Sequence, residues 1–136
     1  MKIAVLDDDK DWHAAMAKMF TKGEHVDYFT THEAFGKVKI STYDIIFIDH
    51  ELKELTGEQV AEGIHEKTDA YIALMASNSV NWSESIVKCD YIKAVLDKSK
   101  LEKFKKFIIT TKNRRRSREY FGKVKKQLER VKKATL

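Results

Sequence analysis

The sequence predicts a doubly wound α/β fold built on a five-stranded parallel sheet. Five short apolar runs recur along the chain, and segments with helical spacing separate them. Strands that alternate with helices form parallel sheets covered on both faces, because each helix returns the chain to the start of the next strand. Aspartates follow the first, third and fifth runs, at the sheet edge where open α/β folds bind their ligands.

The expected elements follow one another in a regular order. Strands are predicted where apolar residues are consecutive, at residues 3–6, 26–29, 45–48, 71–76 and 94–96. Helices are predicted at residues 11–20, 58–67, 79–88 and 100–111. Gly23 marks the expected end of the first helix, and Thr30 and Glu33 have the spacing of a capping box for a small helix.

Composition bounds the class of protein. A chain of 136 residues has room for one domain with a proper core. No apolar run approaches the ~20 residues that a membrane span needs, so no contact with a membrane is expected. Met1 is followed within a few residues by three aspartates, which argues against a secretory signal peptide, and the single cysteine, Cys89, cannot form an internal disulfide. We therefore expect a cytoplasmic protein.

Charge is distributed unevenly along the chain. Residues 1–99 hold 11 Lys/Arg and 18 Asp/Glu, a net charge of −7, whereas residues 100–136 hold 15 and 3, a net charge of +12. The protein is expected to have an acidic body and a basic tail.

Acidic side chains at strand ends predict a metal site. Three aspartates at residues 7–9 follow the first strand, Asp49 follows the third, and Asp97 and Lys98 follow the fifth. Carboxylates gathered at one edge repel one another unless a cation intervenes, and a small oxygen-rich site of this kind favours Mg²⁺. Any one of these aspartates alone is as easily a turn residue, but three converging strand ends favour the metal site.

Three separated segments, KIAVLDDDKDW, YDIIFIDHELKELTG and VLDKSKLEKF, resemble the receiver domain of two-component response regulators. The resemblance covers about residues 2–111 and implies the flavodoxin-like (βα)5 receiver fold. The C-terminal helical extension lies beyond these residues and is predicted from the spacing of the tail itself. The resemblance further implies phosphorelay signal transduction, in which a sensor histidine kinase or phosphotransfer protein phosphorylates Asp49 and a downstream protein target receives the signal. Such a domain catalyses its own phosphorylation and dephosphorylation.

The resemblance also implies roles for individual residues. Asp8 and Asp49 would ligate Mg²⁺ together with the backbone carbonyl of Glu51, and Asp7 would act mainly through water. Lys98 would pair with the phosphoryl group, and Gly57 would close the loop after Asp49. These roles agree with the chemistry, because phosphoryl transfer needs a nucleophile in line and cations that neutralise the charge on the equatorial oxygens.

Several positions depart from the family pattern. Lys53 stands where the family usually has proline, and Val95 stands where it has a switch aromatic. Ser99 replaces the proline after Lys98, so the customary cis peptide would cost about 2.5–4 kcal/mol, or else the loop takes another path. These departures keep a second hypothesis open, a degenerate receiver that acts as a phosphorylation-independent scaffold or as a nucleic-acid adaptor.

The switch hydroxyl expected after the fourth strand has two candidate positions. The simplest alignment places Ala76 there, and Ser77 follows one residue later. We favour Ser77, because a hydroxyl can hydrogen-bond a phosphoryl oxygen and a methyl group cannot. Trp12 and Trp82 are expected to be packing residues. No metal-binding spacing links His13, His25, His32 and His65.

The basic tail carries an apolar stripe of its own. After a basic run at residues 112–118, four apolar residues recur at helical spacing: Phe121, Val124, Leu128 and Val131. On a helix this stripe lies nearly opposite Phe104 and Ile108, so one long helix or two helices with a bend are both open. We expect a receiver domain at residues 1–111 and a basic helical extension at residues 112–136. The extension is predicted to cover the acidic body of its own chain or to form a homodimer, with nucleic-acid contact a less favoured alternative.

Overall fold

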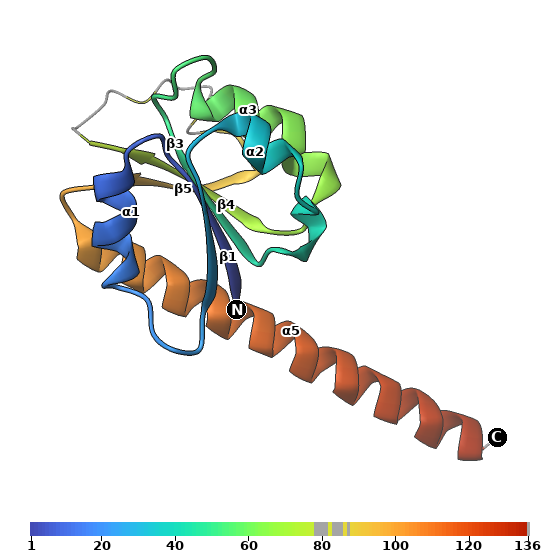
Figure 1. Ribbon diagram of the computed structural model, residues 1–136. Helices are drawn as coiled ribbons and strands as arrows, with labels where there is room; N and C mark the ends of the chain where they lie inside the picture. The colour runs from blue at the N-terminus through green and yellow to red at the C-terminus, as the bar shows by residue number, and fades with distance from the viewer. Residues whose placement is uncertain (78–81, 83–85, 87, 136) are drawn as a thin grey trace.

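The computed structural model describes residues 1–77, 82, 86 and 88–135. Its five strands form one parallel sheet in the order β2-β1-β3-β4-β5 (Figure 1). The strands are β1 Lys2–Leu6, β2 His25–Phe29, β3 Ile45–Asp49, β4 Tyr71–Ala76 and β5 Ile92–Asp97. The helices described are α1 Lys10–Ala17, α2 His32–Gly36, α3 Gly57–Ile64 and α5 Leu101–Thr135. The predicted doubly wound parallel fold is confirmed.

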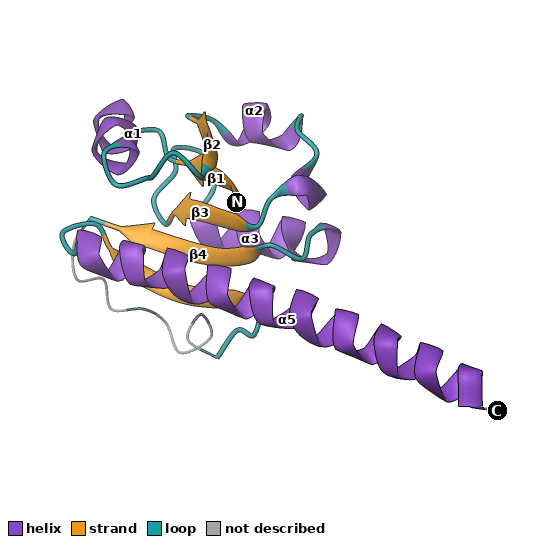
Figure 2. Cartoon of the chain, turned by 90° about the horizontal axis from the view of Figure 1, so that it is seen from below, coloured by secondary structure: helices purple, strands orange, loops and turns teal. Residues whose placement is uncertain are grey.

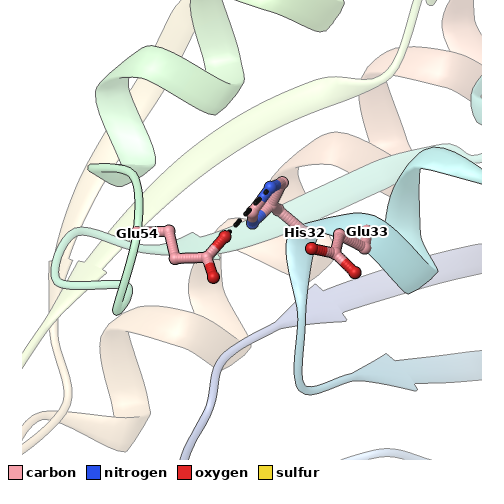
Figure 3. Close-up of side chains that lie close together, drawn as sticks. All are labelled: His32, Glu33 and Glu54. Atoms are coloured by element: carbon pink, nitrogen blue, oxygen red, sulfur yellow. Dashed lines mark ion pairs between the residues drawn. The ribbon is translucent and has the colours of Figure 1, made fainter.

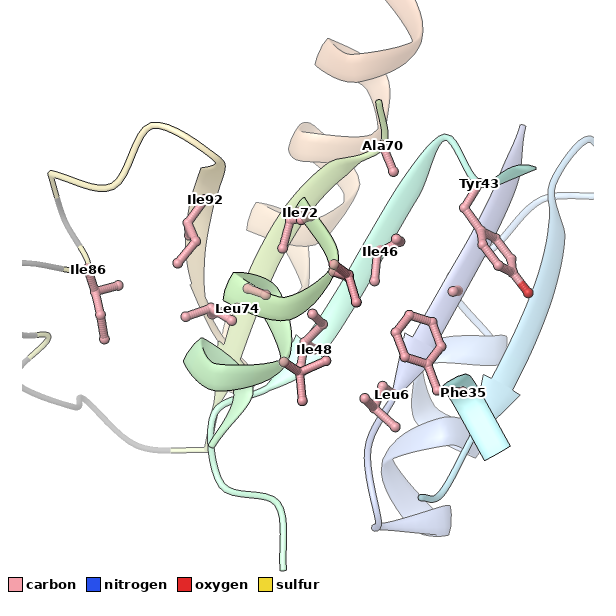
Figure 4. Packing of buried hydrophobic residues seen from close by; sticks show 14 residues of the cluster. Leu6, Phe35, Tyr43, Ile46, Ile48, Ala70, Ile72, Leu74, Ile86 and Ile92 are labelled. Atoms are coloured by element: carbon pink, nitrogen blue, oxygen red, sulfur yellow. The ribbon is translucent and has the colours of Figure 1, made fainter. Parts of the chain in front are cut away.

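Side chains that alternate along the strands are buried on both faces of the sheet. Ile3, Val5 and Phe47 point to the side that α1 and α5 cover. Leu6 and Ile48 point to the opposite side, where they pack with residues of α2 and α3 (Figure 4). Burial on both faces explains why these strands read as continuous apolar runs rather than as an alternation of apolar and polar residues.

The end of the first helix and the capping residues of the next two differ from the prediction. The first helix ends at Ala17, so Gly23 does not end it. Thr31, not Thr30, caps α2 and accepts a hydrogen bond from the backbone N–H of Ala34. The complete capping box lies at α3, where the Thr56 hydroxyl accepts from the backbone of Gln59 and the Gln59 side chain accepts from the backbone of Thr56.

Two other helical segments also differ. The segment after α3 tightens into a 3₁₀ turn, η2, at His65–Lys67, and a second such turn, η1, lies at Ile40–Thr42 before β3. The helix predicted at residues 79–88 falls mostly outside the described residues and stays a prediction.

The last helix is one continuous element. α5 runs from Leu101 to Thr135 without a break, which settles the choice between one long helix and two in favour of one. Phe104, Ile108 and Thr111 are buried against the sheet. Farther along, Arg115 pairs with Asp44 at 2.8 Å.

The second half of α5 leaves the body of the protein. Arg118 lies over the ring of Tyr71, 5.8 Å from its centroid, and beyond it the helix projects past the sheet (Figures 1 and 2). Phe121 is 68% exposed and Leu128 is 56% exposed. The expectation that the acidic body of the same chain covers this stripe is therefore wrong for this structure, because the helix is longer than the sheet it packs on. None of the described helices combines the length and the apolar composition needed to cross a membrane.

Two phenylalanines of α5 offer a matched test of this packing. The Phe104 ring is fully buried and contacts Trp12 edge-on, with ring centroids 5.5 Å apart. We expect Phe104→Ala to lower the free energy of unfolding by about 3–5 kcal/mol, because the cavity left behind adds to the lost apolar burial. Phe121→Ala, on the same helix but exposed, should change it by no more than about 0.5 kcal/mol. Urea unfolding followed by circular dichroism measures both, and equal losses would contradict the packing described.

Candidate functional site

Charged side chains from three strand ends meet at the carboxyl edge of the sheet. Asp7 and Asp8 follow β1, and Asp49 is the last residue of β3, the neighbour of β1. Oxygens of these three carboxylates all lie within 4.8 Å of one another. Lys98 follows β5 and reaches past β4 to place its Nζ 2.5 Å from Asp7 Oδ2 and 3.3 Å from Asp49 Oδ1. We call Asp7, Asp8, Asp49 and Lys98 the strand-end site.

The strand-end site opens into a cleft. Its volume is about 600 Å³, and its walls include Asp11, Trp12, Glu51 and Ser77 in addition to the charged residues. The convergence of strand ends predicted from the sequence is thus present, and it brings the expected acidic residues to one edge.

Local hydrogen bonds hold the charged groups in place. The backbone N–H of Lys98 donates to the Ala76 carbonyl at 2.8 Å, which keeps the loop after β5 beside the end of β4. Asp7 is completely buried, and its Oδ1 accepts from the backbone N–H of Asp9 at 2.9 Å. Because one carboxylate oxygen of Asp7 is bound by the backbone and the other by Lys98, the ammonium has a fixed position beside Asp49.

The strand-end site contains more negative than positive charge. Burial raises the pKa of Asp49 to about 6, and the charge of Asp7 adds to the increase while Lys98 opposes it. Burial alone would lower the pKa of Lys98, but its hydrogen bond to Asp7 and the charges of Asp7 and Asp49 raise the pKa overall, so the ammonium stays charged at neutral pH. One ammonium therefore faces three carboxylates, which leaves an excess of negative charge.

The donor set fits a hard divalent cation. The clustered ligand atoms are all carboxylate oxygens, and Asp8 remains partly exposed to water. Mg²⁺ is bound in proteins by one or two carboxylates and keeps several of its waters, a requirement that a cleft open to solvent meets. Burial is the largest cause of the raised pKa of Asp49, and the charges of Asp7 and Asp8 add to it. A cation among the three carboxylates would relieve that repulsion.

Gly57 allows the loop after Asp49 to fold back against the end of β3. A side-chain carbon added at Gly57 would overlap the Asp49 carbonyl oxygen and lie 2.9 Å from its carbonyl carbon. The Gly57 N–H donates to the His50 carbonyl at 3.0 Å, and Glu51 forms an isolated bridge with Thr56. Any larger residue would displace the backbone that carries Asp49, which gives a steric reason for the glycine at this position.

The structure shows how the chain is arranged at Ser99 and Val95, two positions that depart from the receiver pattern. No cis peptide bond occurs among the described residues, so Lys98 and Ser99 are joined by a trans peptide. The loop instead closes through Asp97, whose Oδ1 accepts from the Ser99 backbone at 2.9 Å and from its hydroxyl at 2.7 Å. Val95 is partly buried beside the core that packs under α3. The loop thus takes the second of the two paths considered from the sequence.

Ala76 and Ser77, the two candidate positions for the switch hydroxyl, differ in exposure. Ala76 is the last residue of β4 and is buried, whereas Ser77 is exposed and lines the cleft.

Trp12 has a position that sequence analysis did not anticipate. Its indole N–H donates to the Met75 sulfur at 3.4 Å, and its ring lies 5.3 Å from the Lys98 ammonium. The expected packing role is confirmed, since Trp12 belongs to the core between the sheet, α1 and α5. Its contact with Lys98 depends on the side chain's direction from α1, which helical spacing alone does not specify.

A second group of possible metal ligands lies near the strand-end site. His32 and Glu33 at the start of α2 and Glu54 in the loop after β3 place ligand atoms within 4.8 Å of one another (Figure 3). His32 Nε2 is 3.7 Å from Glu54 Oε2, and the Glu54 side chain is 68% exposed. A solvated ion pair accounts for this group, so we assign no metal to it.

The raised pKa of Asp49 predicts a dependence of stability on pH. Between about pH 4 and 6 folded Asp49 holds a proton that the unfolded chain has released, so the free energy of unfolding falls as the pH rises through this window. In the absence of divalent cations, Asp49→Asn should remove this decrease and stabilise the protein at pH 7 by about 3 kcal/mol at most.

The control is Asp69→Asn, which changes an exposed carboxylate just before β4 at the opposite edge of the sheet. It should leave the pH profile as in the wild type. Urea unfolding in a chelator at pH 4.5 and pH 7 measures the difference, and a profile for Asp49→Asn that matches the wild type would refute the assignment.

Comparison with known proteins identifies the fold. No protein-family model matches the sequence, and no curated protein matches it. Among solved structures, a two-component response regulator from Clostridium difficile is similar with a TM-score of 0.72 and 26% identity, over 84% of this chain and 97% of that one.

Two further structures are similar over most of the chain. The response regulator protein TrrA from Thermotoga maritima, in complex with Mg²⁺-BeF, has a TM-score of 0.65 and 22% identity, over 81% of this chain and 97% of its own. The BeF3-activated DrrB receiver domain, of the Thermotoga maritima regulator, has a TM-score of 0.70 and 22% identity, over 82% of this chain and 97% of its own. The chain therefore has the flavodoxin-like fold of response regulator receiver domains, with a long C-terminal helix added.

Proposed function

We propose that this protein is a phosphorylation-switched signalling module that accepts a phosphoryl group on Asp49 in a Mg²⁺-dependent reaction. The observation that carries the proposal is the position of the Asp49 carboxylate, within 4.8 Å of the Asp7 and Asp8 carboxylates and 3.3 Å from the Lys98 ammonium. The structural neighbours support a response regulator role, and TrrA, solved with Mg²⁺-BeF, supports the requirement for magnesium.

The chemistry assigned to the site is a single displacement. An Asp49 carboxylate oxygen attacks phosphorus and forms an O–P bond, while the bond from phosphorus to the donor breaks and its electron pair leaves with the donor. We assign the donor as a sensor histidine kinase or a phosphotransfer protein, and the receiver of the signal as a downstream protein. Asp8, Asp49 and the Glu51 carbonyl are the proposed ligands of Mg²⁺, which supplies neutralisation of the charge on the transferred oxygens.

Lys98 and Ser77 take complementary roles in this proposal. Lys98 is held by the buried Asp7 and can exchange its contact with Asp49 for one with the incoming phosphoryl group. Ser77 lines the same cleft and can donate its hydroxyl proton to a phosphoryl oxygen. The phosphorylated state would thus gain contacts at the ends of β4 and β5 that the free state lacks.

We also propose that the signalling domain spans residues 1–111 and that residues 112–136 form an extension with a separate role. Thr111 is the last buried residue of α5 among those described. After it, Lys112 pairs with Glu24, Arg115 pairs with Asp44, and Arg118 lies over the ring of Tyr71. The extension is not required to complete the strand-end site, all of whose residues lie before Ser99.

Phosphorylation can be tested with a small donor. Wild-type protein incubated with acetyl phosphate and Mg²⁺ should gain the mass of one phosphoryl group, because Asp49 is accessible from the cleft. Asp49→Asn should gain none, and Asp69→Asn, at the opposite edge of the sheet, should be labelled as the wild type is. Intact-mass spectrometry provides the measurement, and equal labelling of the wild type and Asp49→Asn would exclude Asp49 as the acceptor.

Metal binding can be tested separately. Asp8→Ala should weaken Mg²⁺ binding at least about tenfold, since a site with few carboxylates cannot lose one without a large loss of affinity. Asp11→Asn is the matched control, because Asp11 lines the same cleft but lies outside the carboxylate cluster. Isothermal titration calorimetry measures both affinities, and Trp12, beside Lys98, offers a fluorescence signal. An unchanged affinity in Asp8→Ala would place the metal elsewhere.

A further inference from the structure

The projecting half of α5 exposes an apolar seam. Phe121 and Tyr120 are 68% and 65% exposed, and their ring centroids are 5.8 Å apart in an edge contact. Leu128, about two turns beyond Phe121, is 56% exposed. Arg118 lies over the ring of Tyr71, and beyond it the helix projects past the sheet (Figure 2). Large apolar side chains gathered on one face of a charged helix indicate a surface for binding a partner.

The spacing of the seam indicates what kind of partner fits. Phe121, Val124, Leu128 and Val131 are separated by three, four and three residues. Spacings of three and four residues together make the seven-residue repeat at which one helix packs along another in a coiled coil. A helix that lies on a membrane surface has a broader apolar face than this narrow stripe. The seam is therefore shaped for a second helix.

Charge beside the seam selects among possible helices. Lys125 and Lys132 directly follow the seam residues Val124 and Val131, and Arg118 lies one heptad before Lys125. On the other flank, Tyr120 and Gln127 directly precede Phe121 and Leu128, and Ala134 lies one heptad after Gln127. Residues 112–136 hold 11 Lys/Arg and 2 Asp/Glu, a net charge of +9. A second copy would bring the same basic surface to the contact and no acidic flank, so it lacks charge complementarity.

We propose that this seam binds an amphipathic helix of a different protein, one with apolar residues at coiled-coil spacing and acidic residues on its flanks. Burial of Phe121 and Leu128 supplies the attraction, and pairing of acidic side chains with Arg118, Lys125 and Lys132 sets the choice of partner. The proposal does not depend on phosphorylation of Asp49, because the seam lies on the part of α5 that extends beyond the sheet.

Two synthetic helices serve as probes of the full-length protein. Both carry three heptads with leucine at the seam positions; the acidic peptide has glutamate at the flanking positions and the basic peptide has lysine there. We expect the acidic peptide to bind, the basic peptide not to bind, and the affinity to fall as salt is raised. Fluorescence anisotropy of labelled peptides measures binding, and circular dichroism confirms that each protein variant keeps its helix content.

Matched substitutions distinguish the seam from general charge attraction. Leu128→Gln and Phe121→Gln should each weaken binding of the acidic peptide about tenfold or more, because each removes a buried contact at the centre of the interface. Lys126→Gln introduces the same residue on the opposite face of the helix and should change binding by no more than about twofold. Equal losses in the seam and control variants would overturn the proposal.

A different occupant of the seam, such as a second copy of the chain, a membrane or DNA, would give a result that refutes the proposal. A mass of two chains by light scattering that Leu128→Gln reduces to one would identify a second copy as the occupant and refute the proposal. Binding to vesicles containing anionic lipid, or to duplex DNA, that is tighter than binding to the acidic peptide would also refute it. Absence of binding to the acidic peptide by the wild type would do so as well.

Discussion

The arrangement of the charged edge depends on one ammonium group held between two carboxylates. Asp7 is fully buried, and Lys98, at the end of β5, places its ammonium 2.5 Å from the Asp7 carboxylate. A buried charge that lacks such a partner costs several kcal/mol, on the order of the desolvation penalty of one ion. For this pair to form, β5 must lie beside β4 and β4 beside β3, so the order of the sheet and the pairing of the charges depend on each other. One ammonium does not neutralise three carboxylates. Burial, and after it the charge of Asp7, raises the pKa of Asp49 to about 6.

Much of the fold was predictable from the sequence, because its strands are buried on both faces. Residues 71–76 were predicted without error, and β3 differs from the prediction only by including Asp49 itself. Helix ends were less predictable. Met19 and Phe20 continue the apolar pattern of the first helix, yet α1 ends at Ala17, and both residues pack on the core from the turn that follows. The spacing of apolar residues predicts which residues are buried, but a residue beyond the end of a helix can be buried too, so the spacing does not show where the helix ends.

In the candidate site, too, some features were predictable from the sequence and others were not. Convergence of the three strand ends follows from parallel topology, and the sequence predicted it. Which carboxylate the ammonium contacts most closely, and the position of the Trp12 ring beside it, depend on side-chain directions that spacing does not determine. The hydrogen bonds from Ser99 to Asp97 show how the chain forms the loop after Lys98 without a proline. The sequence left open whether α5 is continuous or bent. The apolar residues change from one face of the helix to the other along its length, and this pattern fits a bend as well as a straight helix that extends beyond the sheet.

An unbroken α5 also has a mechanical consequence. Its base is clamped against the sheet by Phe104 and Ile108, close to the strand end that carries Lys98, and its far end is free of the sheet. From Thr111 to Thr135 the helix is about 36 Å long at 1.5 Å per residue. A tilt of about 5° at the clamped base would therefore carry the far end through about 3 Å. The length of the helix would therefore amplify a small tilt at the sheet into a displacement comparable to the shifts of about 1–2 Å that rearrange subunit interfaces.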